Sequence, residues 1–519
     1  MKTDKLGGSS SLLAILSGFL LTMAFPKIGL CWLAWFALVP LLIAIRHLSP
    51  KNSFFIGFFA GLVHYLTLVY WLAYTMSTYG HLPDYLCVLI LLLLSMYLAL
   101  YVGVFSMALV RLCSNPYLCL LIGPLIWVSL EYVRAFLISG FPWELIGYTQ
   151  FSQLPIIQIS DIFGVYGVSF VILFSNTVIF LAYLFVTRGD WQGRSVNTRL
   201  AMGSLVTFAL IVGAVWFYGN LRIQFVRDLV SRAPTARIAV VQGNIDQDKK
   251  WDPAFQKAST EKYIRLSSLA KKKQPDLFVW PETATPFYFL NHVALSNIVQ
   301  EGIHEIGSDF LFGSPSFRLQ DNRIEYYNSA FLVGPEGNVY GKYDKSHLVP
   351  FGEYVPLKKW LPFVGKMVES VGDFHAGEKG RTIQWGKYNI GVLICYEIIF
   401  PDLSRAMTQN NAALLFNITN DAWYGRSSAP YQHFSMAIFR AVENRRSLVR
   451  SANTGISGFI DPTGKVVDST PLFQDAVITR KVPILDETTI YSRFGDVFAM
   501  MCLALTAVAA FYELARNKS

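Results

Sequence analysis

Long uncharged, apolar stretches alternate with short polar ones over residues 11–218, and the pattern returns at 496–514. A membrane-spanning helix needs about 20 mostly apolar residues. We therefore expect eight membrane-spanning helices. The stretches that predict them lie at about 10–25, 29–46, 54–76, 85–110, 117–139, 163–187, 199–218 and 494–514.

The segment between the seventh and eighth stretches has a different pattern, in which short strand-like runs alternate with helix-like ones. Residues 238–242, 276–280 and 388–394 are apolar enough for buried strands, and Asp252-Pro253 begins a helix that extends to about Lys272. Such alternation predicts an α/β sandwich, with helices covering the sheets. We expect a membrane domain of seven helices at 1–219, a globular domain at 220–490, and a final helix and tail at 491–519.

Basic residues indicate how the chain is oriented in the membrane. Lys and Arg gather at the N-terminus, in every second loop and at the C-terminus, whereas loops 77–84 and 140–162 contain none and the first turn has only Lys27. Cytoplasmic loops carry an excess of Lys and Arg. We therefore expect both termini to be cytoplasmic and the globular domain to be extracytoplasmic.

Composition supports a membrane protein and argues against a nucleic-acid-binding protein. Of the 519 residues, 53% are hydrophobic and 15% are charged. The net charge of +9 could suggest nucleic acid, but basic membrane loops account for it, and no stripe of aromatic and basic residues suits single-strand binding. No cluster has metal-ligand spacing and no glycine-rich run has the form of a phosphate loop, so we expect no metal and no cofactor.

Three short runs in the globular domain carry reactive side chains. Cys395 follows the apolar run 388–394 and is the only cysteine between residues 219 and 490. Glu282 lies in Trp-Pro-Glu-Thr after another strand-like run, and Lys345 follows a third. A lone buried cysteine, glutamate or lysine is usually structural, but a thiol, a carboxylate and an amine at strand ends are the parts of an acyl-transfer site.

Two features of the membrane half have open interpretations. The loop 140–148 is aromatic and interrupted by Pro and Gly, as in an interfacial aromatic belt or in a lid. Glu131 and Arg134 are three residues apart in a predicted span, which fits a structural pair better than a transport site.

Taken together, the three runs resemble the carbon–nitrogen hydrolase (nitrilase) superfamily, which uses a Glu–Lys–Cys triad. With the run 241–245, the run His347 to Pro356 and the membrane spans, the whole chain resembles the bacterial apolipoprotein N-acyltransferase family. The resemblance implies a four-layer αββα sandwich in the globular domain and a location in the bacterial cytoplasmic (inner) membrane, with that domain in the periplasm.

By this resemblance Glu282 is the general base, Lys345 the electrostatic stabiliser and Cys395 the nucleophile. The family's supporting residues correspond to Glu353, Tyr396 and Glu397, and its substrate-facing aromatics to Trp251 and Trp143. We also expect Phe351 to contact substrate, because loop 140–148 and segment 347–366 are apolar, aromatic and suited to flank an entrance for acyl chains.

The implied reaction moves an acyl chain from a membrane phospholipid, through a Cys395 thioester, to the α-amino group of a lipoprotein's N-terminal diacylglyceryl-cysteine. The expected partners are thus a phospholipid, a diacylglyceryl-modified apolipoprotein and the bilayer. One alternative is a membrane-tethered amidase or nitrilase that hydrolyses a small amide. Another is a transporter or scaffold with an inactive docking domain.

Overall fold

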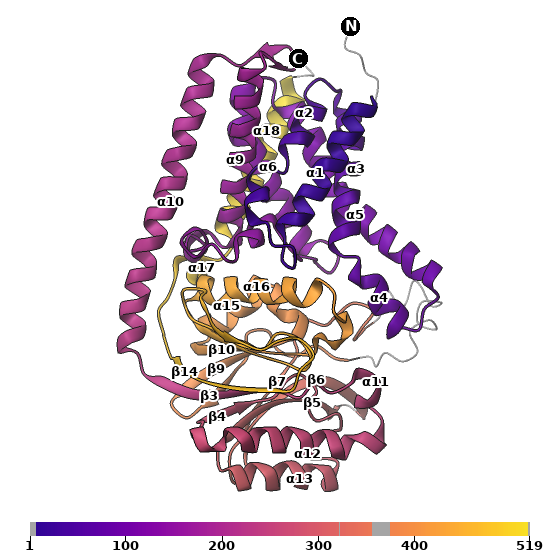
Figure 1. The fold of residues 1–519 in the computed structure, drawn as a ribbon, viewed down its shortest axis with the longest axis vertical. Helices are drawn as coiled ribbons and strands as arrows, with labels where there is room; N and C mark the ends of the chain where they lie inside the picture. The colour runs from indigo at the N-terminus through magenta and orange to yellow at the C-terminus, as the bar shows by residue number, and fades with distance from the viewer. Residues whose placement is uncertain (1–6, 321, 355–373, 517–519) are drawn as a thin grey trace. The chain divides into compact units, whose positions relative to one another are not determined.

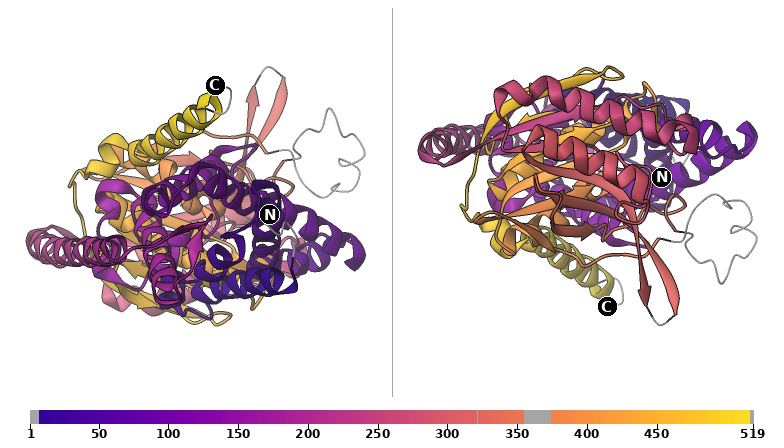
Figure 2. Two further views of the ribbon diagram at one scale, coloured as in Figure 1. Left: turned by 90° about the horizontal axis from the view of Figure 1, so that it is seen from above. Right: turned by 90° about the horizontal axis from the view of Figure 1, so that it is seen from below.

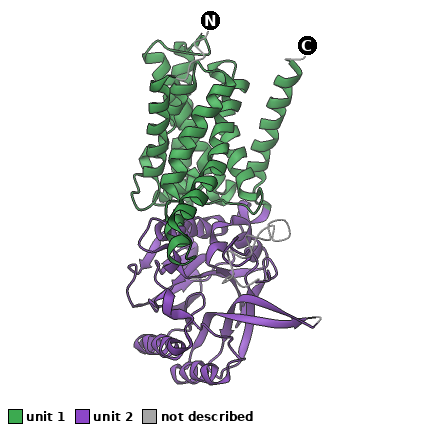
Figure 3. Cartoon of the chain, turned by 90° about the vertical axis from the view of Figure 1, so that its right-hand side faces the viewer, with its two compact units in different colours: residues 1–223, 494–519 green, residues 224–493 purple. Residues whose placement is uncertain are grey.

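The computed structural model describes residues 7–320, 322–354 and 374–516. The chain forms two compact units (Figure 3): unit 1 comprises Met1–Ile223 and Phe494–Ser519, and unit 2 comprises Gln224–Arg493. Each unit is described by itself.

Unit 1 consists of helices. Its α-helices are α1 (Gly8–Ala24), α2 (Val39–Ile45), α3 (Pro50–Leu68), α4 (Trp71–Thr78), α5 (Asp84–Leu112), α6 (Pro116–Phe136), α7 (Leu154–Ile157), α8 (Ser160–Phe163), α9 (Val165–Val186), α10 (Thr198–Arg232), which continues into unit 2, and α18 (Val497–Arg516). Two 3₁₀ helices, η1 (Cys31–Trp35) and η2 (Ile146–Gln150), and a short pair of strands, β1 (Asp190–Trp191) and β2 (Arg194–Ser195), complete it.

Fewer helices than predicted are long and apolar enough to cross a membrane. Among the described residues five qualify, or six if α3 and α4, which meet at an angle of 50°, form one bent span. The predicted spans at 10–25 and 29–46 are shorter apolar helices. The second divides into η1 and α2 because Pro40, which lacks an N–H group, is tolerated only in the first turn of a helix. A count of eight spans therefore stays a prediction.

Unit 2 contains two six-stranded sheets, which confirms the predicted α/β domain. The first sheet has the order β14-β3-β4-β5-β6-β7 and the second β13-β12-β11-β10-β9-β8. The strands are β3 (Thr235–Gln242), β4 (Leu277–Val279), β5 (Asp309–Gln320), β6 (Arg323–Val333), β7 (Val339–Asp344), β8 (Thr382–Trp385), β9 (Tyr388–Ile394), β10 (Ala412–Thr419), β11 (Ser447–Ala452), β12 (Gly458–Ile460), β13 (Val466–Ser469) and β14 (Ala476–Pro483).

Helices cover the outer face of each sheet. The α-helices of unit 2 are α11 (Gln247–Lys250), α12 (Pro253–Ala270), α13 (Val293–Ile306), α15 (Pro401–Gln409), α16 (Ala429–Asn444) and α17 (Ile490–Phe494), and its 3₁₀ helices are η3 (Lys271–Lys273), η4 (Cys395–Ile399) and η5 (Asp421–Tyr424). Figure 1 shows α12 and α13 beside the first sheet and α15 and α16 beside the second, with the two sheets stacked between them. The β5–β6 hairpin extends beyond these layers (Figure 2).

Parallel strands at the centre of each sheet position the site. Strand β10 is buried along all eight residues and pairs in parallel with β9 and β11, and β4 pairs in parallel with β3 and β5. Strands covered on both faces read as continuous apolar runs, which is why these were recognisable in the sequence. Because parallel strands end at one edge of their sheet, the residues that follow β4 and β9 emerge at sheet edges where ligands usually bind.

Candidate active site

Cys395 is the first residue after β9 and has a strained backbone. Its φ is +52°, in the left-handed region that non-glycine residues seldom adopt, and the chain turns there directly into η4. The side chain is 6% exposed. The carbonyl oxygen of Cys395 lies 3.2 Å from His433 Nε2 and accepts a hydrogen bond from Asn417 Nδ2 at 3.4 Å. A strained turn held by such contacts is typical of functional sites.

Glu282 lies in the turn that follows β4, and its carboxylate accepts hydrogen bonds from two donors. Its Oε1 accepts a hydrogen bond from Asn328 Nδ2 at 2.8 Å, and its Oε2 accepts one from the backbone N–H of Asn420 at 2.9 Å. The turn approaches β5 so closely that a Cβ at Gly313 would lie 2.7 Å from the Glu282 Cα atom. A glycine is therefore required at residue 313 for the carboxylate to reach this position.

Lys345 follows β7 and is almost completely buried, with 1% of its side chain exposed. Its Nζ lies 3.8 Å from Glu282 Oε1 and 2.9 Å from Glu353 Oε2. Burial disfavours the ammonium form, but the carboxylates of Glu353 and Glu282 outweigh it and raise the pKa of Lys345. The lysine therefore stays positively charged at neutral pH.

The charges of Glu282 and Lys345 both act on the thiol of Cys395. Burial raises the pKa of the Cys395 thiol, Glu282 raises it further, and Lys345 opposes the rise. A thiol in this environment needs a base to remove its proton, and Glu282 is an ionisable carboxylate beside it. The three residues predicted from the sequence thus come together at the ends of three different strands.

The comparisons with known proteins cover both units. A family model described as apolipoprotein N-acyltransferase N-terminal domain matches residues 17–178, and one described as carbon-nitrogen hydrolase matches residues 237–488. An apolipoprotein N-acyltransferase of Geobacter metallireducens is 46% identical over 508 residues, which cover 98% of this chain and 95% of the relative. One of Methylococcus capsulatus is 32% identical over 515 residues, covering 98% and 97%.

The chain belongs to the apolipoprotein N-acyltransferase family. It is therefore an acyltransferase and, with its apolar helices, a multi-pass membrane protein. Among solved structures, a crystal structure of an amidase from Nesterenkonia sp. is similar to part of the chain, with 19% identity and a TM-score of 0.38 over 52% of this chain and 97% of the amidase.

Glu397 links the segments that carry Cys395 and Lys345. Its Oε2 accepts a hydrogen bond from Ile394 N–H at 2.7 Å, at the end of β9. Its Oε1 accepts hydrogen bonds from the N–H groups of Ser346 at 2.7 Å and His347 at 3.0 Å, directly after Lys345. One buried carboxylate therefore fixes the spacing between two strand ends.

The other predicted supporting residues lie in the same region. Glu353 accepts hydrogen bonds from Lys345 Nζ, from Asn328 Nδ2 at 2.8 Å and from Val349 N–H at 2.8 Å. Tyr396, directly after Cys395, is buried, and its ring lies 5.2 Å from that of Phe400. The ring of His347 lies against that of Phe400, with ring centroids 3.8 Å apart and ring planes tilted by 35°.

The three predicted substrate-facing aromatics differ in exposure. Trp251 is 49% exposed and Phe351 is 54% exposed, both in unit 2. Trp143 is fully buried in unit 1, where its ring lies 4.9 Å from that of Trp71. Of the predicted entrance segment 347–366, residues 355–366 lie outside the described residues.

Asn328 and Lys250 are site residues that sequence reasoning missed. Asn328 lies on β6 in no recognisable motif and donates to both Glu282 and Glu353. Lys250 is buried, and its Nζ donates to the carbonyl oxygen of Glu282 at 3.0 Å. The only signal for Lys250 in the sequence was its position beside Trp251, a predicted substrate-facing residue. This signal was too weak to identify it, because a lysine at such a position could equally lie on the surface.

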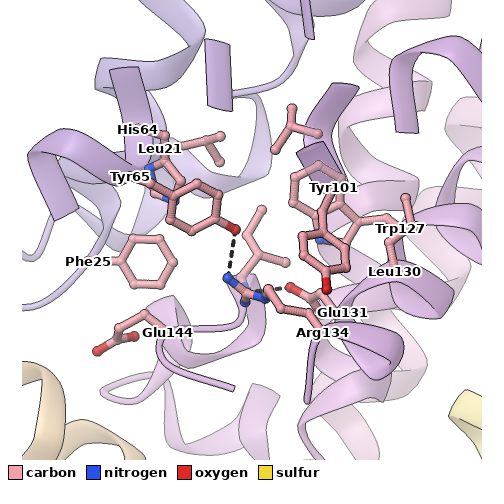
Figure 4. Close-up of a pocket in the computed structure, with 12 residues that line it drawn as sticks. Leu21, Phe25, His64, Tyr65, Tyr101, Trp127, Leu130, Glu131, Arg134 and Glu144 are labelled. Carbon is pink, nitrogen blue, oxygen red and sulfur yellow. Dashed lines mark hydrogen bonds between the residues drawn. The ribbon is translucent and has the colours of Figure 1, made fainter. Parts of the chain in front are cut away.

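Glu131 and Arg134 line a small cavity within unit 1 (Figure 4). Figure 4 shows the Arg134 guanidinium between the Tyr65 hydroxyl and the Glu131 carboxylate, and Arg134 Nη1 donates to that hydroxyl at 2.6 Å. Glu131 Oε1 accepts a hydrogen bond from Ile146 N–H at 2.7 Å. Glu131 thus anchors loop 140–148 to α6, which agrees with the structural interpretation of the pair.

Proposed function

We propose that the enzyme transfers an acyl chain from a membrane phospholipid to the α-amino group of an apolipoprotein's N-terminal diacylglyceryl-cysteine, through a thioester on Cys395. Glu282 is the general base and Lys345 the electrostatic stabiliser. The observation that carries this proposal is the geometry of these two residues: an ammonium 3.8 Å from a carboxylate that two amide N–H groups hold, both acting on a buried thiol.

In the first half-reaction, Glu282 takes the proton of the Cys395 thiol as the sulfur attacks the ester carbonyl of the phospholipid. A carbon–sulfur bond forms, and the carbonyl oxygen becomes an oxyanion. The ammonium of Lys345 stabilises this oxyanion by its positive charge, and the backbone N–H of Tyr396, which directly follows Cys395, can donate a hydrogen bond to it. One such donor typically contributes about 3–4 kcal/mol. The ester carbon–oxygen bond then breaks, and Glu282 returns the proton to the departing lysophospholipid.

In the second half-reaction, the α-amino group of the apolipoprotein attacks the thioester carbonyl. A carbon–nitrogen bond forms, Glu282 accepts the surplus proton of the amine, and the carbon–sulfur bond breaks. The proton then passes to the Cys395 sulfur, which restores the thiol. An α-amino group has a reference pKa of about 8, so a useful fraction is neutral at physiological pH before it enters the site.

The location of the chemistry is part of the proposal. We infer from the basic loops that both termini are cytoplasmic and that unit 2 is extracytoplasmic, in the periplasm of a bacterium with an inner membrane. Because both substrates are lipid-anchored, a catalytic unit joined to apolar helices at each of its ends is suited to reach them from the bilayer surface.

Trapping the acyl-enzyme tests the proposal. Purified enzyme is incubated with a phospholipid labelled in its acyl chain, and the adduct is mapped by mass spectrometry. We expect a hydroxylamine-sensitive adduct on Cys395, its transfer to a diacylglyceryl-cysteine peptide, and neither event in Cys395→Ala. An adduct on another residue, or turnover of a soluble amide with water in place of acyl transfer, would refute the proposed chemistry.

A further inference from the structure

Lys250 is a buried lysine at the reaction centre to which the proposed chemistry gives no role. It is the last residue of α11, and 2% of it is exposed. Its Nζ donates to the main-chain carbonyl oxygen of Glu282 at 3.0 Å. A lysine is almost never fully buried unless its charge has a partner, so its place beside the general base calls for an electrostatic explanation.

The short segment that carries Lys250 also reaches the carboxylate of Glu282. Gln247 Oε1 accepts a hydrogen bond from Asn420 Nδ2 at 2.6 Å, and the N–H of Asn420 donates to Glu282 Oε2 at 2.9 Å. Lys250 itself holds the Glu282 main chain. Helix α11 is therefore connected to both ends of the general base.

The balance of charge in the site supports a second cation. Glu282 and Glu353 bring two buried carboxylates to one ammonium, that of Lys345, at 3.8 and 2.9 Å. With Lys345 alone, these two carboxylates share a single ammonium, and the charge of Glu282 opposes ionisation of the Cys395 thiol. The charges of Glu282 and Cys395 both favour the ammonium form of Lys250, so Lys250 lies within their electrostatic reach.

We propose that Lys250 is a positioning residue of the acyl-transfer site, which holds the Glu282 turn through its carbonyl group and supplies the second positive charge that stabilises the Cys395 thiolate. The inference rests on the triad roles proposed above and adds a fourth residue to them. Lys250 transfers no proton in this scheme. It lowers the cost of separating charge when the thiol proton moves to Glu282.

The titration of Lys250 fits this role. Burial lowers the pKa of Lys250 to about 8, although Glu282 and Cys395 oppose the fall. The ammonium form therefore predominates at neutral pH. The charged groups that act on the Cys395 thiol also include Lys345 and Asp421, and both are unchanged in a Lys250 variant.

The test measures the pH dependence of Cys395 reactivity in the full-length enzyme in detergent–phospholipid micelles. Iodoacetamide labels the thiol from about pH 6 to about pH 10, mass spectrometry quantifies labelling at Cys395, and the same samples are assayed for acylation by labelled phospholipid. The variants separate charge from hydrogen bonding. Lys250→Met removes both, Lys250→Gln keeps a donor without charge, and Lys250→Arg keeps the charge. Lys249→Met is the matched control, because Lys249 is the exposed neighbouring lysine.

We expect Lys250→Met to raise the pH of half-maximal labelling by about one unit and to slow acylation about ten-fold at neutral pH. Lys250→Gln should show the same shift with a smaller loss of rate, whereas Lys250→Arg and Lys249→Met should keep the wild-type midpoint. A purely structural lysine would reduce the amount of folded enzyme without moving the midpoint of the molecules that remain folded.

Two results would overturn the inference: equal midpoints in wild type and Lys250→Met, or complete recovery of midpoint and rate by Lys250→Gln, which would leave only the hydrogen bond. If Lys250→Met does not fold, the labelling midpoints of Lys250→Gln and Lys250→Arg are sufficient to decide between charge and hydrogen bonding. Cys395→Ala is run in parallel. If Cys395→Ala still forms the acyl-enzyme, the triad proposal fails. If Cys395→Ala is inactive and Lys250→Met has the wild-type labelling midpoint, only the proposed role of Lys250 is rejected.

Discussion

Lys345 Nζ lies 2.9 Å from Glu353 Oε2, which makes Glu353 its closer counter-ion because Glu282 Oε1 is 3.8 Å away. The nearest donors of Glu282 are instead two neutral amides, those of Asn328 and Asn420. In the proposed mechanism, this division lets Glu353 hold the lysine while Glu282 accepts the thiol proton.

Glu282→Gln and Lys345→Ala should each abolish most acyl transfer, for different reasons. Gln keeps the shape of Glu282 but cannot accept the thiol proton, and Ala removes the charge that stabilises the oxyanion. Because residues that act as one unit are not additive, the double variant should be little worse than either single variant. Single-turnover acylation by labelled phospholipid measures this, and fully additive losses would contradict a single site.

The Lys345→Ala variant requires a stability control. Removing the ammonium leaves Glu282 and Glu353 buried without their shared counter-ion. Loss of one partner of a buried ion pair typically lowers the free energy of unfolding by about 3–5 kcal/mol. The folded fraction in detergent should therefore be measured beside activity, and Glu282→Gln, which leaves Lys345 with its closer counter-ion Glu353, is the cleaner test of catalysis.

Glu397→Gln should reduce the rate of acylation without changing the identity of the nucleophile. The amide of Gln has one acceptor oxygen, so it cannot serve both Ile394 N–H on one side and the N–H groups of Ser346 and His347 on the other. The spacing of Cys395 and Lys345 should loosen, and a displacement of about 1 Å can cost about 100-fold in rate. We expect a fall in kcat with KM for phospholipid little changed. An effect on KM alone would mean that Glu397 acts in substrate binding.

Stability should respond to pH through Lys250 with a defined sign. The pKa of Lys250 is about 8 in the folded protein and the ordinary value is 10.5. Between these two values the unfolded chain binds more protons than the folded chain, so the free energy of unfolding rises with pH. Below pH 8 both states are protonated and the full cost of burying the charge is present.

Comparison of wild type with Lys250→Met isolates this contribution. As pH rises from about 7 to about 10, the thermal midpoint of the wild type should increase relative to that of the variant, because only the wild type relieves the cost of burying this ammonium by releasing its proton. Intrinsic tryptophan fluorescence in detergent follows the transition. A difference that stays constant with pH would show that Lys250 does not titrate in this range.

Phe351→Ala should slow acylation by a long-chain phospholipid more than acylation by a short-chain, water-soluble thioester. Phe351 is 54% exposed, so its truncation leaves the fold of unit 2 intact while removing an apolar contact for acyl chains. Trp143→Ala is a poorer probe, since Trp143 is fully buried and replacing such a residue by Ala typically costs about 3–5 kcal/mol. Equal losses with both donors would assign Phe351 to the architecture of the site.

Reporter fusions test the proposed orientation. A reporter inserted near residue 300 should behave as extracytoplasmic and one near residue 190 as cytoplasmic, because Arg188, Arg194 and Arg199 surround the second position. A periplasm-dependent phosphatase and a cytoplasm-dependent fluorescent protein give opposite signals at each position. Reversed signals would place the catalytic unit away from its proposed substrates.

Much of the fold of unit 2, and the candidates for its proposed triad, could be identified from the sequence because the relevant signals are local. The runs before Glu282 and Cys395 are mostly apolar, as is typical of buried parallel strands, and a reactive side chain after such a run emerges at a sheet edge. The turn at 335–338, which connects β6 to β7, consists of Pro, Glu, Gly and Asn, and such turn residues are likewise a local signal. None of these inferences needed a distant part of the chain.

Only the tertiary structure decided the residues around the triad and the extent of the membrane helices. Asn328 lies on a strand and Lys250 at the end of a one-turn helix, and whether either is buried depends on segments distant in sequence that fold over it. Hydropathy likewise identified apolar stretches but not where backbone breaks shorten them, as between η1 and α2. The sequence by itself determined which strands are buried and which reactive groups end them, because those properties depend on neighbouring residues. The partners of Glu282 and Lys345 and the burial of Trp143 depended on packing between remote segments, which no local pattern encodes.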